Sequence, residues 1–123
     1  MIAFASRTGN VRYIVQRLEL PSVQIEETSV LCEPFLLITY TDGLGAIPPI
    51  VEQFMEENGQ HCQGVVVSGN RNFGHVNFGG AGDKLARQWR VPLVRKLELR
   101  GFPDDYAAIR HYYEQCFGRE HAR

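Results

Sequence analysis

The sequence lacks the features that mark several large classes of protein. No apolar run approaches the ~20 residues that a helix needs to span a bilayer, so we expect no membrane association. The apolar start MIAFA is too short for a signal peptide and has no basic leader. An excess of one charge is also missing, because the formal net charge is -1 and the basic residues are scattered. That balance argues against nucleic-acid binding, and we expect a soluble protein of the cytoplasm.

Cysteine is scarce and poorly arranged for cross-linking. Cys32, Cys62 and Cys116 are odd in number and widely spaced, and no C-x-x-C pair occurs. This pattern favours reduced thiols in a cytoplasm over a disulfide framework or a zinc site. The histidines show no metal-ligand spacing such as H-E-x-x-H. We expect no bound metal.

What the sequence does contain is an alternation of strand and helix patterns. With 123 residues, of which 44% are apolar, residues 1–123 are enough for one domain with its own core. Apolar runs predict five strands, at 1–6, 23–25, 34–40, 64–69 and 93–99. Apolar residues at helical spacing predict four helices, at 11–18, 47–55, 81–90 and 106–116.

This alternation predicts an α/β fold with a parallel sheet, because right-handed crossovers join parallel strands through helices. The runs 34–40 and 64–69 are apolar throughout, which is typical of central strands covered on both faces. The run 93–99 alternates with polar residues, as expected nearer a sheet edge. The most economical strand order is 2-1-3-4-5, with a ligand crevice at the carboxyl ends of strands one and three.

Three loops that follow strands one, three and four share a composition of glycine, hydroxyl and amide residues. They are SRTGN at 6–10, TDGLG at 41–45 and SGNRNFGHVNFGG at 68–80. In the predicted topology all three meet at one edge of the sheet. They are therefore the candidate ligand-binding loops.

The first loop opens a helix, where free N–H groups and the helix dipole favour an anion. Ser6 and Thr8 add hydroxyl groups, and Asn10 adds an amide. The loop has neither the lysine of a P-loop nor a G-x-G-x-x-G pattern, so it suits a terminal monophosphate better than a reacting triphosphate. An ordinary helix N-cap is the alternative interpretation.

The other two loops suit a flat ligand. Tyr40 is either a stacking surface or simply the end of a strand, and Phe73 and Phe78 pack on a planar ligand or on the core. The loop at 68–80 is longer than the ~2–6 residues usual between strand and helix. Together the loops describe a phosphate-bearing planar heterocycle, anchored at 6–10 and held between 41–45 and 68–74.

These motifs resemble those of a known family. SRTGN after the first strand resembles the phosphate loop of flavodoxins, and the further set ITYTDGLG, VSGNRNFG and AGDKLA is similar to the NrdI family. The resemblance covers nearly the whole chain and implies a flavodoxin-like three-layer sandwich that binds FMN. It implies that the phosphate end contacts Ser6, Arg7, Thr8, Gly9, Asn10 and Val11. It places the flavin ring between Tyr40, Thr41, Asp42, Gly43 and Gly45 on one side and Ser68, Gly69, Asn70, Asn72, Phe73 and Gly74 on the other.

The resemblance also implies a function. NrdI-like flavoproteins assist class Ib ribonucleotide reductase, their reduced flavin reacting with dioxygen to supply a superoxide-level oxidant for the dimanganese-tyrosyl radical cofactor. The implied partners are the small, radical-bearing subunit and a flavin or redoxin reductase as electron donor. Because the flavin carries the chemistry, we expect no catalytic side chain, and a maturation factor rather than a stand-alone metabolic enzyme.

Two departures from flavodoxins affect these expectations. Val11 stands where flavodoxins have a further hydroxyl, so one phosphate contact is expected to be missing. The loop at 68–80 has no acidic residue but carries Arg71 and His75. We therefore expect a smaller electrostatic penalty on the anionic reduced flavin than in acidic flavodoxins.

Alternative functions differ in what the sequence must supply. A receiver domain needs a carboxylate cluster where only Asp42 is available, a low-molecular-weight phosphatase needs C-x5-R, and a serine hydrolase needs a motif such as G-x-S-x-G around Ser6. None of these requirements is met. An ordinary one-electron flavodoxin and a non-redox module that binds a phosphorylated ligand remain open, and a yellow purified protein would favour the flavoprotein.

Overall fold

A computed structural model describes residues 1–25, 30–74 and 77–118 of the chain. Five strands form one parallel sheet in the order β2-β1-β3-β4-β5, as the sequence predicts. Their bounds are β1 (Ile2–Phe4), β2 (Ser22–Gln24), β3 (Phe35–Tyr40), β4 (Cys62–Gly69) and β5 (Leu93–Glu98). The helices are α1 (Asn10–Leu18), α2 (Pro49–Asn58), α3 (Gly80–Trp89) and α4 (Pro103–Phe117), with 3₁₀ turns η1 (Gly59–His61) and η2 (Arg71–Phe73).

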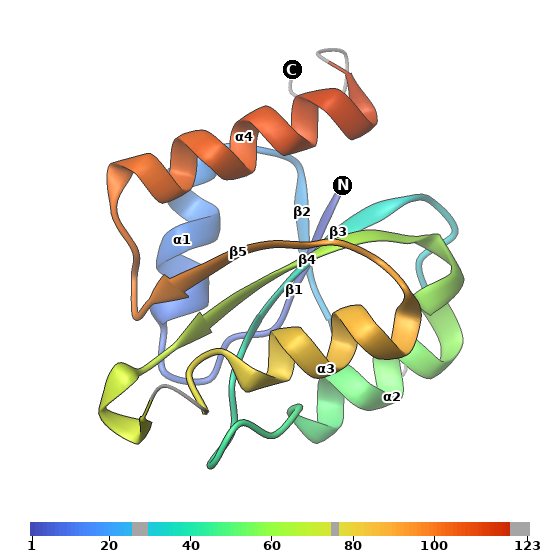
Figure 1. Ribbon diagram of the computed structural model, residues 1–123. Helices are drawn as coiled ribbons and strands as arrows, with labels where there is room; N and C mark the ends of the chain where they lie inside the picture. The colour runs from blue at the N-terminus through green and yellow to red at the C-terminus, as the bar shows by residue number, and fades with distance from the viewer. Residues whose placement is uncertain (26–29, 75–76, 119–123) are drawn as a thin grey trace.

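The sheet is the middle of three layers (Figure 1). On one face α1 and α4 bury Ile14 and Ile109 against Ile2 and other sheet residues. On the opposite face α2 and α3 bury Phe54 and Leu85 against a second set of sheet residues. Since successive strand residues point to opposite faces, a strand covered on both sides must be apolar at every position. This explains the apolar stretches at 35–38 in β3 and 65–67 in β4, all of them buried.

The α4 helix begins earlier than the apolar spacing predicts, at Pro103 rather than near Tyr106. Proline suits a first helical turn because its missing N–H has no intrahelical partner there. The Asp105 carboxylate then accepts hydrogen bonds from the Phe102 N–H and from Arg95 Nε, each at 2.8 Å. These contacts lock the start of α4 onto β5, and apolar periodicity alone carries no sign of them.

The helices of this structure are short. Within the described ranges, none is both long and apolar enough to cross a membrane.

Candidate functional site

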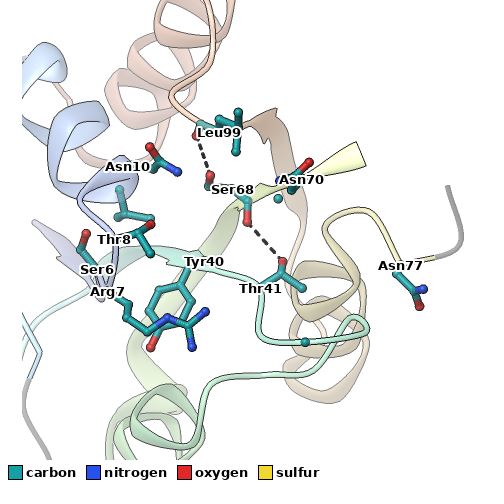
Figure 2. Close-up of a pocket in the computed structure, with 13 residues that line it drawn as sticks. Ser6, Arg7, Thr8, Asn10, Tyr40, Thr41, Ser68, Asn70, Asn77 and Leu99 are labelled. Carbon is teal, nitrogen blue, oxygen red and sulfur yellow. Dashed lines mark hydrogen bonds between the residues drawn. The ribbon is translucent and has the colours of Figure 1, made fainter. Parts of the chain in front are cut away.

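The carboxyl ends of β1, β3 and β4 surround a cavity of about 300 Å³, shown in Figure 2. It lies where β1 has β2 on one side and β3 on the other, which is the topological switch point at which open α/β sheets bind ligands. The residues that line it come from all three candidate loops and from the end of β5. They are Ser6, Arg7, Thr8, Asn10, Val11, Tyr40, Thr41, Gly43, Ser68, Gly69, Asn70, Asn77 and Leu99.

The turn between β1 and α1 presents free space and free backbone donors. Gly9 has a φ of 95°, a left-handed conformation that favours glycine, and a Cβ built there would meet nothing within 4 Å. It sits at the N-cap of α1 and supplies no side-chain cap. Ser6 Oγ accepts the Arg12 N–H at 3.2 Å. The alternative interpretation, that these polar residues only cap the helix, thus accounts for Ser6. It does not account for Thr8 and Asn10, which line the cavity and do not cap α1.

Tyr40 closes the same cavity with an aromatic ring. The Arg7 guanidinium lies 5.1 Å from the ring centroid, and Figure 2 shows the two side chains against each other. Burial raises the pKa of Tyr40 above its usual value, the Asp42 carboxylate raises it further, and Arg7 offsets part of the increase. Tyr40 is therefore a neutral phenol at physiological pH, which suits contact with a flat aromatic ring.

Asp42 does not itself line the cavity, but its carboxylate pairs with Arg7, which does. Arg7 Nη1 lies 2.7 Å from Asp42 Oδ1, and Oδ1 is buried without a hydrogen-bond partner. The contact is an ion pair, with the Arg7 side chain 60% exposed and that of Asp42 23% exposed. The two side chains therefore place one basic and one acidic group beside the cavity.

A chain of hydrogen bonds fixes the opposite side of the cavity. Thr41 Oγ1 donates to the Ser68 carbonyl at 3.2 Å, and Ser68 Oγ donates to the Leu99 carbonyl at 2.5 Å (Figure 2). The Leu99 N–H in turn donates to the Gly69 carbonyl at 2.8 Å. These bonds join the ends of β3, β4 and β5 into one rigid edge.

Leu99 and Asn77 line the cavity although the sequence does not predict either as a site residue. By its sequence Asn77 is only one of several amides in the third loop. Leu99 falls at the end of a predicted strand, and in the structure it follows β5 at the same edge of the sheet. The signal that locates Leu99 is the topology, because all parallel strands present their carboxyl ends to one edge.

Six predicted site residues lie outside the cavity lining: Gly9, Asp42, Gly45, Asn72, Phe73 and Gly74. Gly45 is a packing residue, because the Cβ of a substituted Gly80 would lie 2.9 Å from its Cα. The Asn72 N–H donates to the Asn70 side chain at 2.9 Å and shapes η2. The Phe73 side chain and His75 lie outside what the structure describes.

The third loop is held by charged contacts that the sequence does not indicate. The Arg71 guanidinium lies 5.0 Å from the Phe78 ring centroid, and its Nη1 is 4.0 Å from Glu98 Oε1. Lys96 Nζ lies 5.9 Å from the same ring and donates to the Phe78 carbonyl at 3.0 Å. Phe78 thus packs between two cations. The loop itself has no acidic residue, but β5 brings Glu98 beside Arg71.

Comparison with known families decides what kind of site this is. A family model described as NrdI flavodoxin-like matches residues 2–111, from β1 into α4. The chain belongs to the NrdI family. Members of this family are FMN-binding, flavodoxin-like proteins involved in the activation of class Ib ribonucleotide reductase.

The NrdI site fits FMN on the observations above. One end of the cavity has a helix N-terminus at which Gly9 supplies no side-chain cap and leaves open space, which suits a phosphate. The other end has the neutral Tyr40 ring and the polar backbone near Gly43 and Gly69. Within the described residues no group of three or more His, Cys, Asp or Glu side chains could hold a metal ion. The start of α1 and the Tyr40 ring together suit a phosphate-bearing aromatic cofactor.

Proposed function

We propose that this cavity holds FMN, with the phosphate at residues 6–10 and the ring between residues 40–45 and 68–70. The observation that carries the proposal is the meeting of the start of α1 and the Tyr40 ring in one cavity at the switch point of the sheet. Thr8 and Asn10 then bind the phosphate, and Tyr40 contacts the ring. Gly9 acts through its left-handed backbone and the open space beside it, Gly45 by letting Gly80 approach closely, and Asp42 through Arg7.

We further propose that the protein activates the small subunit of class Ib ribonucleotide reductase in the cytoplasm, taking electrons from a flavin or redoxin reductase. The cofactor, when bound, supplies the reduction of dioxygen to the superoxide-level oxidant that the small subunit uses for its dimanganese-tyrosyl radical site. The protein's own residues bind and orient the cofactor and present it to the partner. No side chain needs to act as an acid or base.

Exposed apolar side chains support docking of the partner over the cavity. Leu44, on the loop after β3, is 74% exposed, and Leu99, which lines the cavity, is 44% exposed. Large exposed apolar residues are a feature of interaction surfaces when they gather around one site. Partner contact there would seal the cavity and keep a diffusible oxidant from being lost to solvent.

The test combines the reduced protein, dioxygen and a manganese-loaded class Ib small subunit, and measures tyrosyl radical by electron paramagnetic resonance. We expect radical with the wild-type protein and less with Leu44→Ser. Val30→Ser is the matched control, since Val30 is 69% exposed and lies outside the cavity lining. If the same amount of tyrosyl radical forms without this protein, or with an ordinary flavodoxin in its place, the activation role is refuted. The protein would then be a generic electron carrier.

A further inference from the structure

A second groove, about 700 Å³ in volume, lies between the C-terminal half of α1 and the start of α4. These two helices cover the same face of the sheet (Figure 1). The groove is lined by three arginines and two tyrosines, among other residues: Arg17, Arg100, Arg110, Tyr13 and Tyr106. We call this set the arginine groove.

The positive charge of the arginine groove is not compensated by ion pairs. Glu19 also lines the groove, but over the described part of the chain none of the three arginines forms an ion pair. By contrast, the basic residues near the cavity and along β5 each face a carboxylate; they are Arg7, Arg71, Arg95 and Lys96. Among the described residues the groove thus gathers three cations that form no ion pair, and Arg110 instead donates to the Arg17 carbonyl at 2.7 Å.

Two of these cations are held against one ring. The guanidinium carbons of Arg17 and Arg100 lie 5.1 and 4.6 Å from the Tyr13 ring centroid. The Tyr13 hydroxyl also accepts hydrogen bonds from Arg17 Nε at 3.0 Å and Nη2 at 2.7 Å. Like charges kept this close repel each other, and an anion in the groove would relieve the repulsion.

The backbone around Arg100 is also constrained. Leu99 has a φ of 55° and Gly101 a φ of 74°, and the left-handed region is disfavoured for a residue with a side chain such as Leu99. Leu99 is fixed by its bonds to Ser68 and Gly69. The Tyr106 hydroxyl donates to the Arg100 carbonyl at 2.5 Å. The Arg100 side chain therefore projects from a fixed segment, as a preformed binding residue should.

Neighbouring apolar residues indicate what kind of anion binds. Phe102 is 65% exposed and Leu99 is 44% exposed, and they flank Arg100 and Gly101 in the chain. A free phosphate makes no apolar contacts, so these residues would not contribute to its binding. Protein interfaces, by contrast, combine arginine and aromatic side chains at their centres. Arginine also binds carboxylates through two parallel hydrogen bonds.

We propose that the arginine groove docks a carboxylate-rich segment of a protein partner, with Phe102 packing on an apolar residue of that segment. Because Leu99 lines the cavity and adjoins Arg100, the docked segment lies alongside the FMN site. This surface does not depend on the function proposed above. A protein that failed to activate ribonucleotide reductase would still bind the segment.

The test is a nuclear magnetic resonance titration of the oxidised, FMN-loaded, ¹⁵N-labelled protein. The probe is a short glutamate-rich peptide with a central leucine, compared with the same peptide carrying glutamine in place of glutamate. We expect amide and arginine side-chain shifts confined to the arginine groove and Phe102, weakened by added salt and absent with the glutamine peptide. Shifts spread over the whole surface, or equal shifts with both peptides, would overturn the proposal.

Variants sharpen the result. Arg100→Gln should lower the affinity for the glutamate peptide roughly tenfold or more. Phe102→Ser should also lower this affinity, without changing how the affinity responds to salt. Arg87→Gln is the matched control, because Arg87 is an exposed arginine on α3, across the sheet from the groove. Equal affinities for Arg100→Gln and Arg87→Gln would refute the assignment. Groove shifts with tripolyphosphate but none with the peptide would show a phosphate site and overturn the protein-segment proposal.

Discussion

Arg7 Nη1 lies 2.7 Å from Asp42 Oδ1 and joins the turn after β1 to the turn after β3. The pair sits beside the Tyr40 ring, so one cation and one carboxylate accompany the aromatic wall of the cavity. Asp42 Oδ1 itself is buried, although the Asp42 side chain as a whole is 23% exposed. This pair therefore contributes to the electrostatic environment of the proposed ring site.

Asp42→Asn should raise the reduction potential of bound FMN. Fully reduced flavin is anionic near neutral pH, and removing a nearby carboxylate favours that anion. At an effective dielectric constant of ~20, one unit charge in a site of this size contributes roughly 1–2 kcal/mol, which corresponds to some tens of millivolts. Potentiometric titration measures the change. Glu114→Gln on the exposed side of α4 is the control, and a fall in potential for Asp42→Asn would contradict the argument.

Thr8→Ala should weaken FMN binding and leave the fold intact. A hydroxyl that donates to a charged acceptor contributes about 1.5–3 kcal/mol, so the dissociation constant should rise roughly tenfold to a hundredfold. The residue is exposed at the cavity mouth, so the melting temperature of the apoprotein should not change. Ser22→Ala, at an exposed hydroxyl on β2, controls for general effects. An unchanged affinity would place the phosphate away from residues 6–10.

Gly80→Ala should reduce FMN affinity by moving one binding loop. Its Cβ would lie 2.9 Å from the Gly45 Cα and 3.0 Å from the Gly45 oxygen, so the backbone of the second loop has to shift. Gly82→Ala is the matched comparison, because its Cβ would meet Val67 Cγ1 at 2.6 Å and Leu93 Cδ1 at 2.9 Å. Overpacking of this kind costs about 1–3 kcal/mol of stability. We expect both variants to be destabilised in urea, and Gly80→Ala to lose more FMN affinity at equal stability.

Cys62 should resist alkylation in the native protein. Burial raises the pKa of the Cys62 thiol to about 11, and hydrogen bonds to backbone groups only partly oppose this. Cys32 and Cys116 are exposed and should react first at mildly alkaline pH, as mass spectrometry can show. The same shift affects stability: the unfolded thiol ionises near 9, so the native state should lose up to about 2–3 kcal/mol as the pH rises from 9 to 11. Cys62→Ala should remove that loss, and a pH dependence retained in the variant would assign it to another group.

Local patterns in the sequence are enough to predict the strands, the helices and the order of the sheet. The apolar runs at β3 and β4 follow from burial of these strands on both faces of the sheet. The helical spacing of apolar residues in α1 follows from burial of one face of that helix. Parallel strands end at one edge, so the sequence alone places the three glycine-rich loops together. The ends of helices are harder to predict from the sequence. The start of α4, for example, involves the contact of Asp105 with Arg95 on β5, which joins two separate elements.

Only the tertiary structure decided which charged and aromatic groups face one another at the site. Arg71 and Glu98, or Phe78 and Lys96, lie far apart in the chain and meet because β4 and β5 pair in one particular register. A shift of that register by one residue would turn Glu98 and Lys96 to the other face of the sheet. Residue types and local spacing therefore specify the site's location and its donors, whereas strand register, which long-range packing sets, decides its charge balance.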